Sequence, residues 1–359
     1  MTQGPIPTEL IKSLPKTDLH VHLDGSLRPA TVLDLAGAQG VDIPVKDLDG
    51  LERLIDTAMG GLPNYLRVFD TILKVLQTRE ALERTAFELA ETAHNENIRY
   101  VEVRFSPSLH EEKGLSSTEI VDAVLRGLKA AGEKYGILSG VILCGIRTIS
   151  PEESLRLARI AVSYKGRGVV GFDLAGEEKD YPAKDHIDAF HTILNNNVNC
   201  TVHAGEGFGA PSIAQAIHYC GAHRVGHGTR LIEDDGLLQY VKDHRIPLEI
   251  CLSSNVHTGA TDTIEAHPFK TYFDLKLRVT LNTDNRLISR TDMTQELDLA
   301  SRHFALSIYD LRKILINGFK SAFLPHDEKV ALLHRAIDEM DRLFSDYFPD
   351  TYTPYRTFL

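Results

Sequence analysis

The stretch Thr17-Asp-Leu-His-Val-His-Leu-Asp-Gly25 alternates in polarity as a β-strand does. Because strand side chains point to opposite faces with a period of two, His20 and His22 project to one side and the aliphatic residues around them to the other. Two neutral imidazoles at this spacing can hold one metal ion from a rigid backbone. A pair of hydrogen-bonded histidines near a strand end gives the same pattern, so this stretch alone leaves both interpretations open.

Outward from this stretch, further apolar and β-branched runs alternate with segments of helical pattern. Several of the runs are almost continuously apolar, which is typical of parallel strands covered on both faces. The predicted strands are 17–22, 98–104, 138–145, 168–174, 198–203, 223–227, 247–252 and 278–283. Strands that alternate with helices predict an α/β fold, here a parallel (β/α)8 TIM barrel. An open doubly wound sheet is the alternative, but no Gly-rich phosphate loop follows the first strand.

The helical segments carry start and stop signals. Ser116-Ser-Thr-Glu119 and Ser150-Pro-Glu-Glu153 are capping-box patterns, the second with proline at the first helical position. Gly136 and Gly166 are predicted to end these two helices. We also expect extra helices after the last strand, all within one domain spanning residues 1–359.

A mostly helical insert, residues 26–97, separates the first two predicted strands. Within Gly61–Asp70, apolar side chains recur at i, i+3, i+4 and i+7, namely Leu62, Tyr65, Leu66 and Phe69. This spacing predicts a helix with one apolar face. Two interpretations fit that face: it packs into the core, or it forms a lid over a ligand pocket at the barrel mouth.

Composition narrows the class of partner. The chain has 359 residues and a net charge of −11, with 39 basic and 50 acidic side chains, so nucleic acid and anionic membrane are poor partners and a small molecule is favoured. The amino terminus lacks the pattern of a signal peptide, and no run approaches the length of a membrane span. The four cysteines lie far apart, which argues against a cysteine zinc cluster and a disulfide framework, and favours a cytoplasmic protein. The sequence does not indicate an oligomeric state.

Residues suited to metal or acid–base chemistry lie at the carboxyl ends of four of the predicted strands. They lie in His20-Val-His22-Leu-Asp24, His203-Ala-Gly-Glu206, Arg224-Val-Gly-His227 and Asn282-Thr-Asp284-Asn285. In a barrel the catalytic groups come from the carboxyl ends of the strands, so these side chains should meet at one mouth. Glu102 and Arg104, near the end of the second strand, are interpreted instead as a structural ion pair.

Three imidazoles and a carboxylate with one open position would make a catalytic zinc site. The ion would lower the pKa of a bound water from 15.7 to about 7 and so generate hydroxide near neutral pH. Glu206 and His227 are the candidates for the acid and the base that such a reaction needs.

At this point the motifs resemble those of a known family. HVHLDGS, DLAGEE (Asp173–Glu178), HAGE, RVGHGT and LNTDN are similar, in order and spacing, to the motifs of the adenosine deaminase family in the amidohydrolase superfamily. The resemblance covers about residues 15 to 340. It implies one zinc ion per chain and an enzyme that deaminates adenosine or 2′-deoxyadenosine to the inosine product plus ammonia, by attack of zinc-bound hydroxide on purine C6.

The resemblance also implies residue roles. The zinc ligands would be His20, His22, His203 and Asp284, and Asp284 would also hold the attacking water. Glu206 would protonate purine N1, and His227 would orient and deprotonate the water. The substrate would contact His22, Asp24 at a ribose hydroxyl, Gly176 at ring N3, Asn285 at N7, and the apolar lid residues Leu62, Tyr65 and Phe69.

One departure from the animal-type pattern is Asn285, where that pattern has a second aspartate. An asparagine amide donates a hydrogen bond to N7 at any pH, so the change is chemically tolerable, although it affects fine substrate preference. The alternatives are deaminases of adenine or of 5′-modified adenosines such as methylthioadenosine and aminodeoxyfutalosine. A non-catalytic barrel scaffold is a minor alternative, because every metal ligand and the acid are present.

Overall fold

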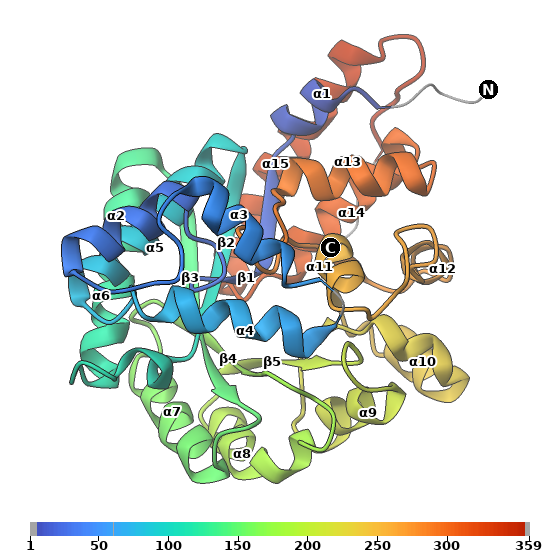
Figure 1. Ribbon diagram of the computed structural model, residues 1–359. Helices are drawn as coiled ribbons and strands as arrows, with labels where there is room; N and C mark the ends of the chain where they lie inside the picture. The colour runs from blue at the N-terminus through green and yellow to red at the C-terminus, as the bar shows by residue number, and fades with distance from the viewer. Residues whose placement is uncertain (1–5, 60, 356–359) are drawn as a thin grey trace.

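The computed structural model describes residues 6–59 and 61–355 and contains one parallel sheet of eight strands in the order β1 to β8. The strands curl into a barrel surrounded by helices (Figure 1). The predicted (β/α)8 TIM barrel is therefore confirmed, and each predicted strand is present. The strands are β1 (Lys16–His22), β2 (Ile98–Phe105), β3 (Leu138–Ile146), β4 (Val169–Ala175), β5 (Asn199–Ala204), β6 (Arg224–His227), β7 (Leu248–Ile250) and β8 (Val279–Leu281).

The barrel closes between β1 and β8 with few backbone bonds. An isolated parallel bridge joins Val21 to Asp284. The His22 N–H donates to the Asp284 carbonyl oxygen at 2.8 Å, and the Asp284 N–H donates to the His20 carbonyl oxygen at 2.7 Å. Further from the carboxyl mouth, a side chain takes the place of a backbone partner between these two strands. There the Leu19 N–H donates to the Asn282 side-chain oxygen at 3.0 Å.

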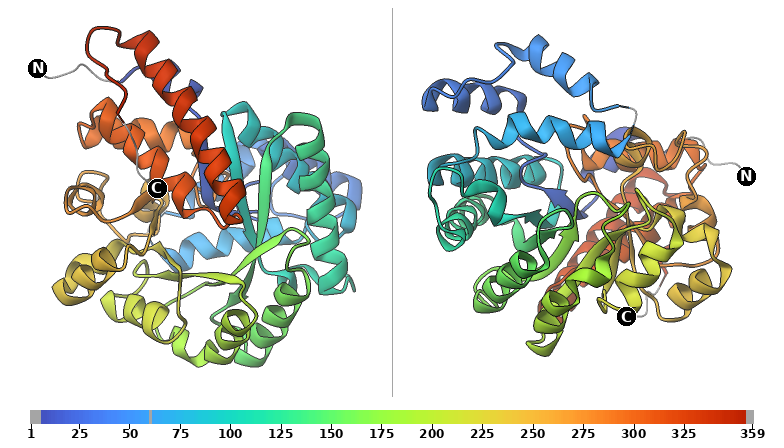
Figure 2. Two further views of the ribbon diagram at one scale, coloured as in Figure 1. Left: turned by 180° about the vertical axis from the view of Figure 1, so that it is seen from behind. Right: turned by 60° about the horizontal axis from the view of Figure 1, so that its bottom comes forward.

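Helices cover the barrel on its outside, as the two further views show (Figure 2). Those that follow β2 to β7 are α6 (Ser117–Tyr135), α7 (Pro151–Ser163), α8 (Ile187–Asn195), α9 (Ala210–His218), α10 (Asp235–Asp243), α11 (Leu252–His257) and α12 (Phe269–Asp274), with short 3-10 helices at Pro107–His110, Ala183–His186 and Thr229–Glu233. Ser116 caps α6 in a complete capping box, and Gly136 ends it in the left-handed conformation, with φ at 73°. Ser150 likewise caps α7, but α7 ends at Ser163 rather than at Gly166, because the chain has already turned at Tyr164.

The insert after β1 holds α2 (Pro29–Gln39), α3 (Leu48–Asp56), α4 (Leu62–Leu73) and α5 (Arg79–Asn95). Because α5 packs against β2 and α6, it takes the place of a regular barrel helix. The additional structure is therefore α2 to α4, and α4 lies across the barrel in Figure 1.

Three helices follow β8: α13 (Met293–His303), α14 (Ile308–Ser321) and α15 (His326–Tyr347). Helix α14 packs against both β8 and β1, so it completes the ring of barrel helices. Helices α13 and α15 are extra elements that pack with the amino-terminal helix α1 (Thr8–Ser13).

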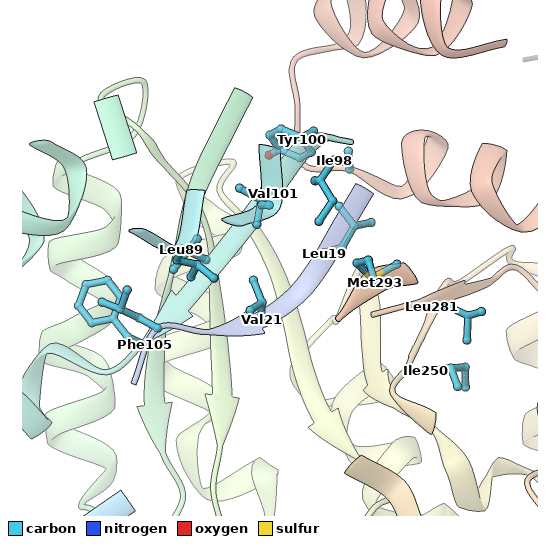
Figure 3. Packing of buried hydrophobic residues seen from close by; sticks show 14 of the residues in the cluster. Leu19, Val21, Leu89, Ile98, Tyr100, Val101, Phe105, Ile250, Leu281 and Met293 are labelled. Carbon is cyan, nitrogen blue, oxygen red and sulfur yellow. The ribbon is translucent and has the colours of Figure 1, made fainter. Parts of the chain in front are cut away.

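The two faces of β1 have different surroundings. Leu19, Val21 and Leu23 are fully buried, and Figure 3 shows Leu19 and Val21 in the apolar cluster with Val101 of β2 and Leu89 of α5. The alternate residues His20 and His22 point into the barrel toward its carboxyl mouth. Among the described residues, no helix combines the length and the apolar character needed to cross a membrane.

Candidate metal centre and substrate pocket

The barrel brings together the four side chains expected to bind metal. His20 and His22 come from β1, His203 from β5 and Asp284 from the loop after β8, and one ligand atom of each lies within 4.8 Å of the others. The Nε2 atoms of His22 and His203 are 3.1 Å apart. The Asp284 Oδ1 atom is 3.4 Å from His20 Nε2 and 3.3 Å from His22 Nε2.

The donor set fits a cation. The Nδ1 atom of His20 lies 2.8 Å from a Glu249 carboxylate oxygen, and the Nδ1 atom of His203 lies 2.9 Å from an Asp173 carboxylate oxygen. With the ring proton on the Nδ1 atom beside each carboxylate, the Nε2 atoms of His20 and His203 carry lone pairs. These lone pairs face the site, and the buried His20 Nε2 has no hydrogen-bond partner. Converging lone pairs of this kind repel unless a cation lies between them, and carboxylate–histidine–metal arrangements orient ligands in this way.

Burial also keeps two of the three ligating imidazoles, those of His22 and His203, neutral. Loss of solvent lowers the pKa of His203, and it lowers the pKa of His22 well below that of a free imidazole. Neutral imidazole is the form that binds metal, so this electrostatic setting favours ligation over protonation.

A charged network inside the barrel supports these ligands. The buried guanidinium of Arg104 contacts both Asp173 and Glu249, each at 2.9 Å, and so holds the two carboxylates that contact His203 and His20. The expected ion pair between Glu102 and Arg104 is wrong. The two side chains are two residues apart on β2 and so share its inner face, but each has a partner on another strand, and Glu102 pairs with Arg224 of β6.

A cavity of about 290 Å³ adjoins the metal-binding group. Its lining contains every residue predicted to touch substrate: His22, Asp24, Leu62, Tyr65, Phe69, Gly176 and Asn285. The apolar face of α4 thus covers the cavity, which is the lid interpretation of its spacing. The Tyr65 hydroxyl lies 2.7 Å from Ser289 Oγ and joins this helix to the loop after β8.

Glu206 and His227 face this cavity beside Asp284. The His227 Nε2 atom is 3.5 Å from a Glu206 carboxylate oxygen. Burial, reinforced by the charges of Asp284 and Glu178, raises the pKa of Glu206 well above that of a free glutamate. A carboxyl group of this kind keeps its proton near neutral pH and can act as a general acid.

The backbone at the mouth is strained at two of these residues. His227 has φ at 61° and Asp284 has φ at 62°, both in the left-handed region that favours glycine. Such conformations cost about 1–3 kcal/mol each and cluster at functional sites, where the surrounding structure holds them.

Asp24 also lines the cavity. Burial raises the pKa of Asp24 to about 7, and its Oδ1 atom has no partner. Gly25 follows because the Asn285 side chain fills the space beside it: a Cβ on Gly25 would lie 1.8 Å from Asn285 Oδ1. The HLDG motif and Asn285 therefore depend on each other sterically.

Several residues that support the site were not among the predicted site residues. Glu178 accepts hydrogen bonds from the backbone N–H groups of Gly205, Glu206 and Gly207, at 2.9, 2.8 and 3.0 Å. Ser254 donates to Asp284 Oδ2 at 2.6 Å, and Asn255 contacts His227. Glu178 could have been found from the DLAGEE motif, whereas the roles of Ser254 and Asn255 depend on the path of α11.

A parallel barrel with three histidines and an aspartate at its carboxyl mouth defines the class, a barrel hydrolase of the amidohydrolase type. The chain belongs to the adenosine deaminase family, whose model matches residues 15–339. It is an enzyme of that family, acting on carbon–nitrogen bonds of cyclic amidines.

Individual proteins agree with this assignment. The chain is 45% identical over 351 residues to an adenosine deaminase of Mycobacterium sp. (strain KMS), covering 93% of this chain and 97% of that protein. The crystal structure of an Arabidopsis N6-mAMP deaminase has a TM-score of 0.83 at 29% identity, covering 92% and 99% of the two chains. An amidohydrolase from Burkholderia ambifaria, crystallised with bound Zn, has a TM-score of 0.88 at 23% identity and 97% coverage of both chains, and it supports the fold alone.

Proposed function

We propose that this enzyme is a zinc-dependent hydrolase that converts adenosine and 2′-deoxyadenosine, with water, to inosine and 2′-deoxyinosine plus ammonia. The observation that carries the proposal is the placement of a proton-holding carboxyl, Glu206, beside the converging metal ligands in a cavity that also exposes Asp24. The family assignment and the 45% identical adenosine deaminase support the same activity.

One zinc ion per chain would be held by His20, His22, His203 and Asp284. When bound, it would lower the pKa of a water molecule and make that water nucleophilic near neutral pH. In the reaction a bond would form between a water oxygen and purine C6, and the bond from C6 to the exocyclic nitrogen would break. Of the two water protons, one would leave with that nitrogen as ammonia and the other would replace the proton that Glu206 gives to ring N1.

The protein's own groups would prepare the purine ring. Glu206 would give its proton to ring N1, which makes C6 electron-poor and open to attack. Asp284 and His227 lie beside Glu206 and would orient the water toward C6. The apolar face of α4 would exclude bulk solvent, which strengthens each of these polar interactions.

Substrate recognition would divide between base and sugar. Gly176 would offer its backbone to ring N3, and the Asn285 amide would donate to N7. The unpartnered Asp24 oxygen would accept a ribose hydroxyl. A site built to bind a hydroxyl can reject an analogue that lacks it by about 10⁴-fold, so a nucleoside is favoured over free adenine.

A substrate panel tests the proposal. Turnover of adenosine, 2′-deoxyadenosine, adenine, AMP and methylthioadenosine would be followed by ultraviolet absorbance, together with the zinc content of the protein. We expect adenosine and 2′-deoxyadenosine to have the largest kcat/KM. A larger value for adenine, AMP or methylthioadenosine would reassign the substrate, and zinc-loaded protein inactive on all of them would favour the scaffold alternative.

A further inference from the structure

The outer side of the His227 imidazole, away from the cavity, is held by a chain of hydrogen bonds that the proposed reaction does not use. His227 Nδ1 lies 3.0 Å from Asn255 Nδ2. The Asn255 Oδ1 atom is 3.1 Å from His267 Nε2 and accepts from the Thr229 hydroxyl at 3.0 Å. His267 Nδ1 in turn accepts from the backbone N–H of Phe269 at 3.0 Å. Asn255 is fully buried, and His227 and His267 are nearly so.

The positions of the protons in this series of hydrogen bonds follow from its last bond, between the Phe269 N–H and His267 Nδ1. A backbone N–H can only donate, so His267 Nδ1 must offer a lone pair to Phe269. The one proton of the neutral His267 ring is therefore on Nε2, where it points at Asn255. Burial lowers the pKa of His267 to about 3, in agreement with a neutral ring.

The orientation of the Asn255 amide is fixed by the same logic. Heavy-atom positions alone do not distinguish an amide oxygen from its nitrogen. Here the Nε2–H group of His267 requires an acceptor, so the Asn255 oxygen faces His267 and its NH2 group faces His227. A donor opposite His227 Nδ1 leaves that nitrogen unprotonated, and the proton of the neutral ring lies on Nε2.

We propose that His267 and Asn255 are positioning residues that set the tautomer of His227, so that His227 presents an Nε2–H donor to the reacting water. This inference rests on the proposed function for its catalytic meaning, but not for its geometry. Nε2 is the atom that faces Glu206 and the cavity. A nitrogen that already carries a proton has no lone pair to accept another.

The consequence is a narrower role for His227 than the family resemblance implied. His227 orients the water and donates a hydrogen bond to its oxygen, and it does not remove the water's proton. Because Glu206 already holds a proton, the neighbouring group in this space that can accept one is the carboxylate of Asp284. Electrostatic stabilisation by a fixed donor is a large contribution in many hydrolytic sites.

The tautomer can be read directly by NMR. The zinc-supplied protein would be labelled with ¹⁵N-histidine, and the His227 ring signals would be identified by their loss in His227→Gln. We expect a protonated Nε2 and an unprotonated Nδ1 for His227 in the wild type. The opposite pattern overturns the proposal, whether or not the protein has activity.

Asn255→Asp is the decisive variant. A carboxylate there still accepts from His267 and Thr229, but it presents an acceptor to His227 Nδ1, so the ring should change to the Nδ1–H tautomer. We expect kcat to fall about 10²-fold, the usual contribution of one positioned proton-bearing group, with KM little changed. An unchanged His227 signal in a folded Asn255→Asp protein overturns the proposal.

His267 supplies a second test and its own rescue. His267→Leu removes the donor that orients the amide and should give mixed His227 tautomers, whereas His267→Gln can donate to Asn255 and accept from Phe269, and should retain the wild-type signal. Thr229→Val is the matched control, because a hydroxyl adapts to either amide orientation. A tautomer change in Thr229→Val, or none in His267→Leu, overturns the role of His267. If the wild type fails to turn over any 6-aminopurine, the proposed function fails, while the NMR result still decides this inference.

Discussion

Glu206 combines a buried position with two carboxylate neighbours, and both properties keep its proton in place. Glu206→Gln retains the size and hydrogen bonding of the side chain but cannot transfer a proton to N1. We expect kcat to fall by about 10²–10⁴-fold while zinc content stays unchanged. Glu206→Asp, which keeps an acid at a greater distance, should lose less. Near-full activity in the glutamine variant would show that another group donates the proton.

Asp24 is the residue through which the sugar would be recognised. Because its buried carboxyl has an unpartnered oxygen, a substrate hydroxyl can complete its hydrogen bonding. Asp24→Ala should lower kcat/KM for adenosine by a factor of about 10² or more, whereas turnover of free adenine should change little. The measurement is the ratio of the two kcat/KM values in variant and wild type. Equal losses on both substrates would contradict a ribose contact.

Glu178 acts on the reaction through the loop that carries Glu206. Its carboxylate accepts three successive backbone N–H groups, and a glutamine there would direct an NH2 group at one of these donors. We expect Glu178→Gln to cost about 1–3 kcal/mol of unfolding free energy and to lower kcat about tenfold. Combining it with Glu206→Gln provides the control. If Glu178 works by positioning Glu206, the double variant loses no more activity than Glu206→Gln alone.

The grouping of the proposed metal and acid–base residues could be predicted because each lies at or just after the carboxyl end of a strand within a short local motif, and a barrel brings strand ends together. The residues that support them could not. Glu249 lies on a three-residue strand and contacts His20 across the barrel interior, and Asn255 reaches His227 from helix α11. Contacts of this kind depend on the register of neighbouring strands, which a single sequence does not specify.

At the scale of whole elements, the strands were predicted more accurately than the boundaries of the insert. Each strand has a continuous apolar or alternating pattern that the barrel buries. In contrast, α5 has the same amphipathic pattern as the lid helices before it, and only its packing against β2 and α6 makes it a barrel helix. Periodicity reports that a helix has an apolar face but not which surface covers that face.

Helix α13 holds the short helix α11 through one buried side chain. Glu296 accepts hydrogen bonds from the backbone N–H groups of Leu252 and Ser253 and from the Thr291 hydroxyl. Burial raises the pKa of Glu296 from 4.5 to about 7. This contact places the helix that carries Ser254 and Asn255, so Glu296 links an outer helix to the site.

The raised pKa of Glu296 predicts a pH-dependent stability. Between the unfolded pKa of 4.5 and the folded value of about 7, the folded protein binds more protons than the unfolded chain. The contribution of Glu296 to the free energy of unfolding therefore falls as pH rises through this window, by on the order of 3 kcal/mol. Above the window this contribution is constant. Glu296→Gln should flatten this part of the profile. The difference in unfolding free energy between wild type and variant, from about pH 5 to about pH 8, measures the effect, and a difference independent of pH would contradict it.

On the scale of the whole molecule, the proposed metal site lies on the weakest seam of the barrel. Strands β2 and β3 pair over six consecutive residues, Tyr100–Phe105 with Leu138–Leu143. Strands β1 and β8 share one isolated bridge, Val21 to Asp284. The proposed ligands His20 and His22 flank that bridge and Asp284 is part of it, so a bound ion would join the first and last strands where the backbone does so least.

Removal of the metal should therefore loosen the seam first. A ligand that binds only the folded state stabilises it by about 4 kcal/mol when the ligand concentration is 1,000 times Kd. Chelation of the ion should therefore lower the thermal midpoint of unfolding, and added zinc should restore it. Hydrogen exchange locates the effect. The His22 and Asp284 amides, which bond across the seam at 2.8 and 2.7 Å, should exchange faster in the chelated protein, while the amides between β2 and β3 stay protected. Equal acceleration in both pairs would mean that the ion stabilises the barrel as a whole.

Because the hydrogen bonds that would open belong to the backbone of His22 and Asp284, loss of the metal would also disorder its own ligands. Reloading with zinc should therefore be slower than the binding of zinc to a preformed site.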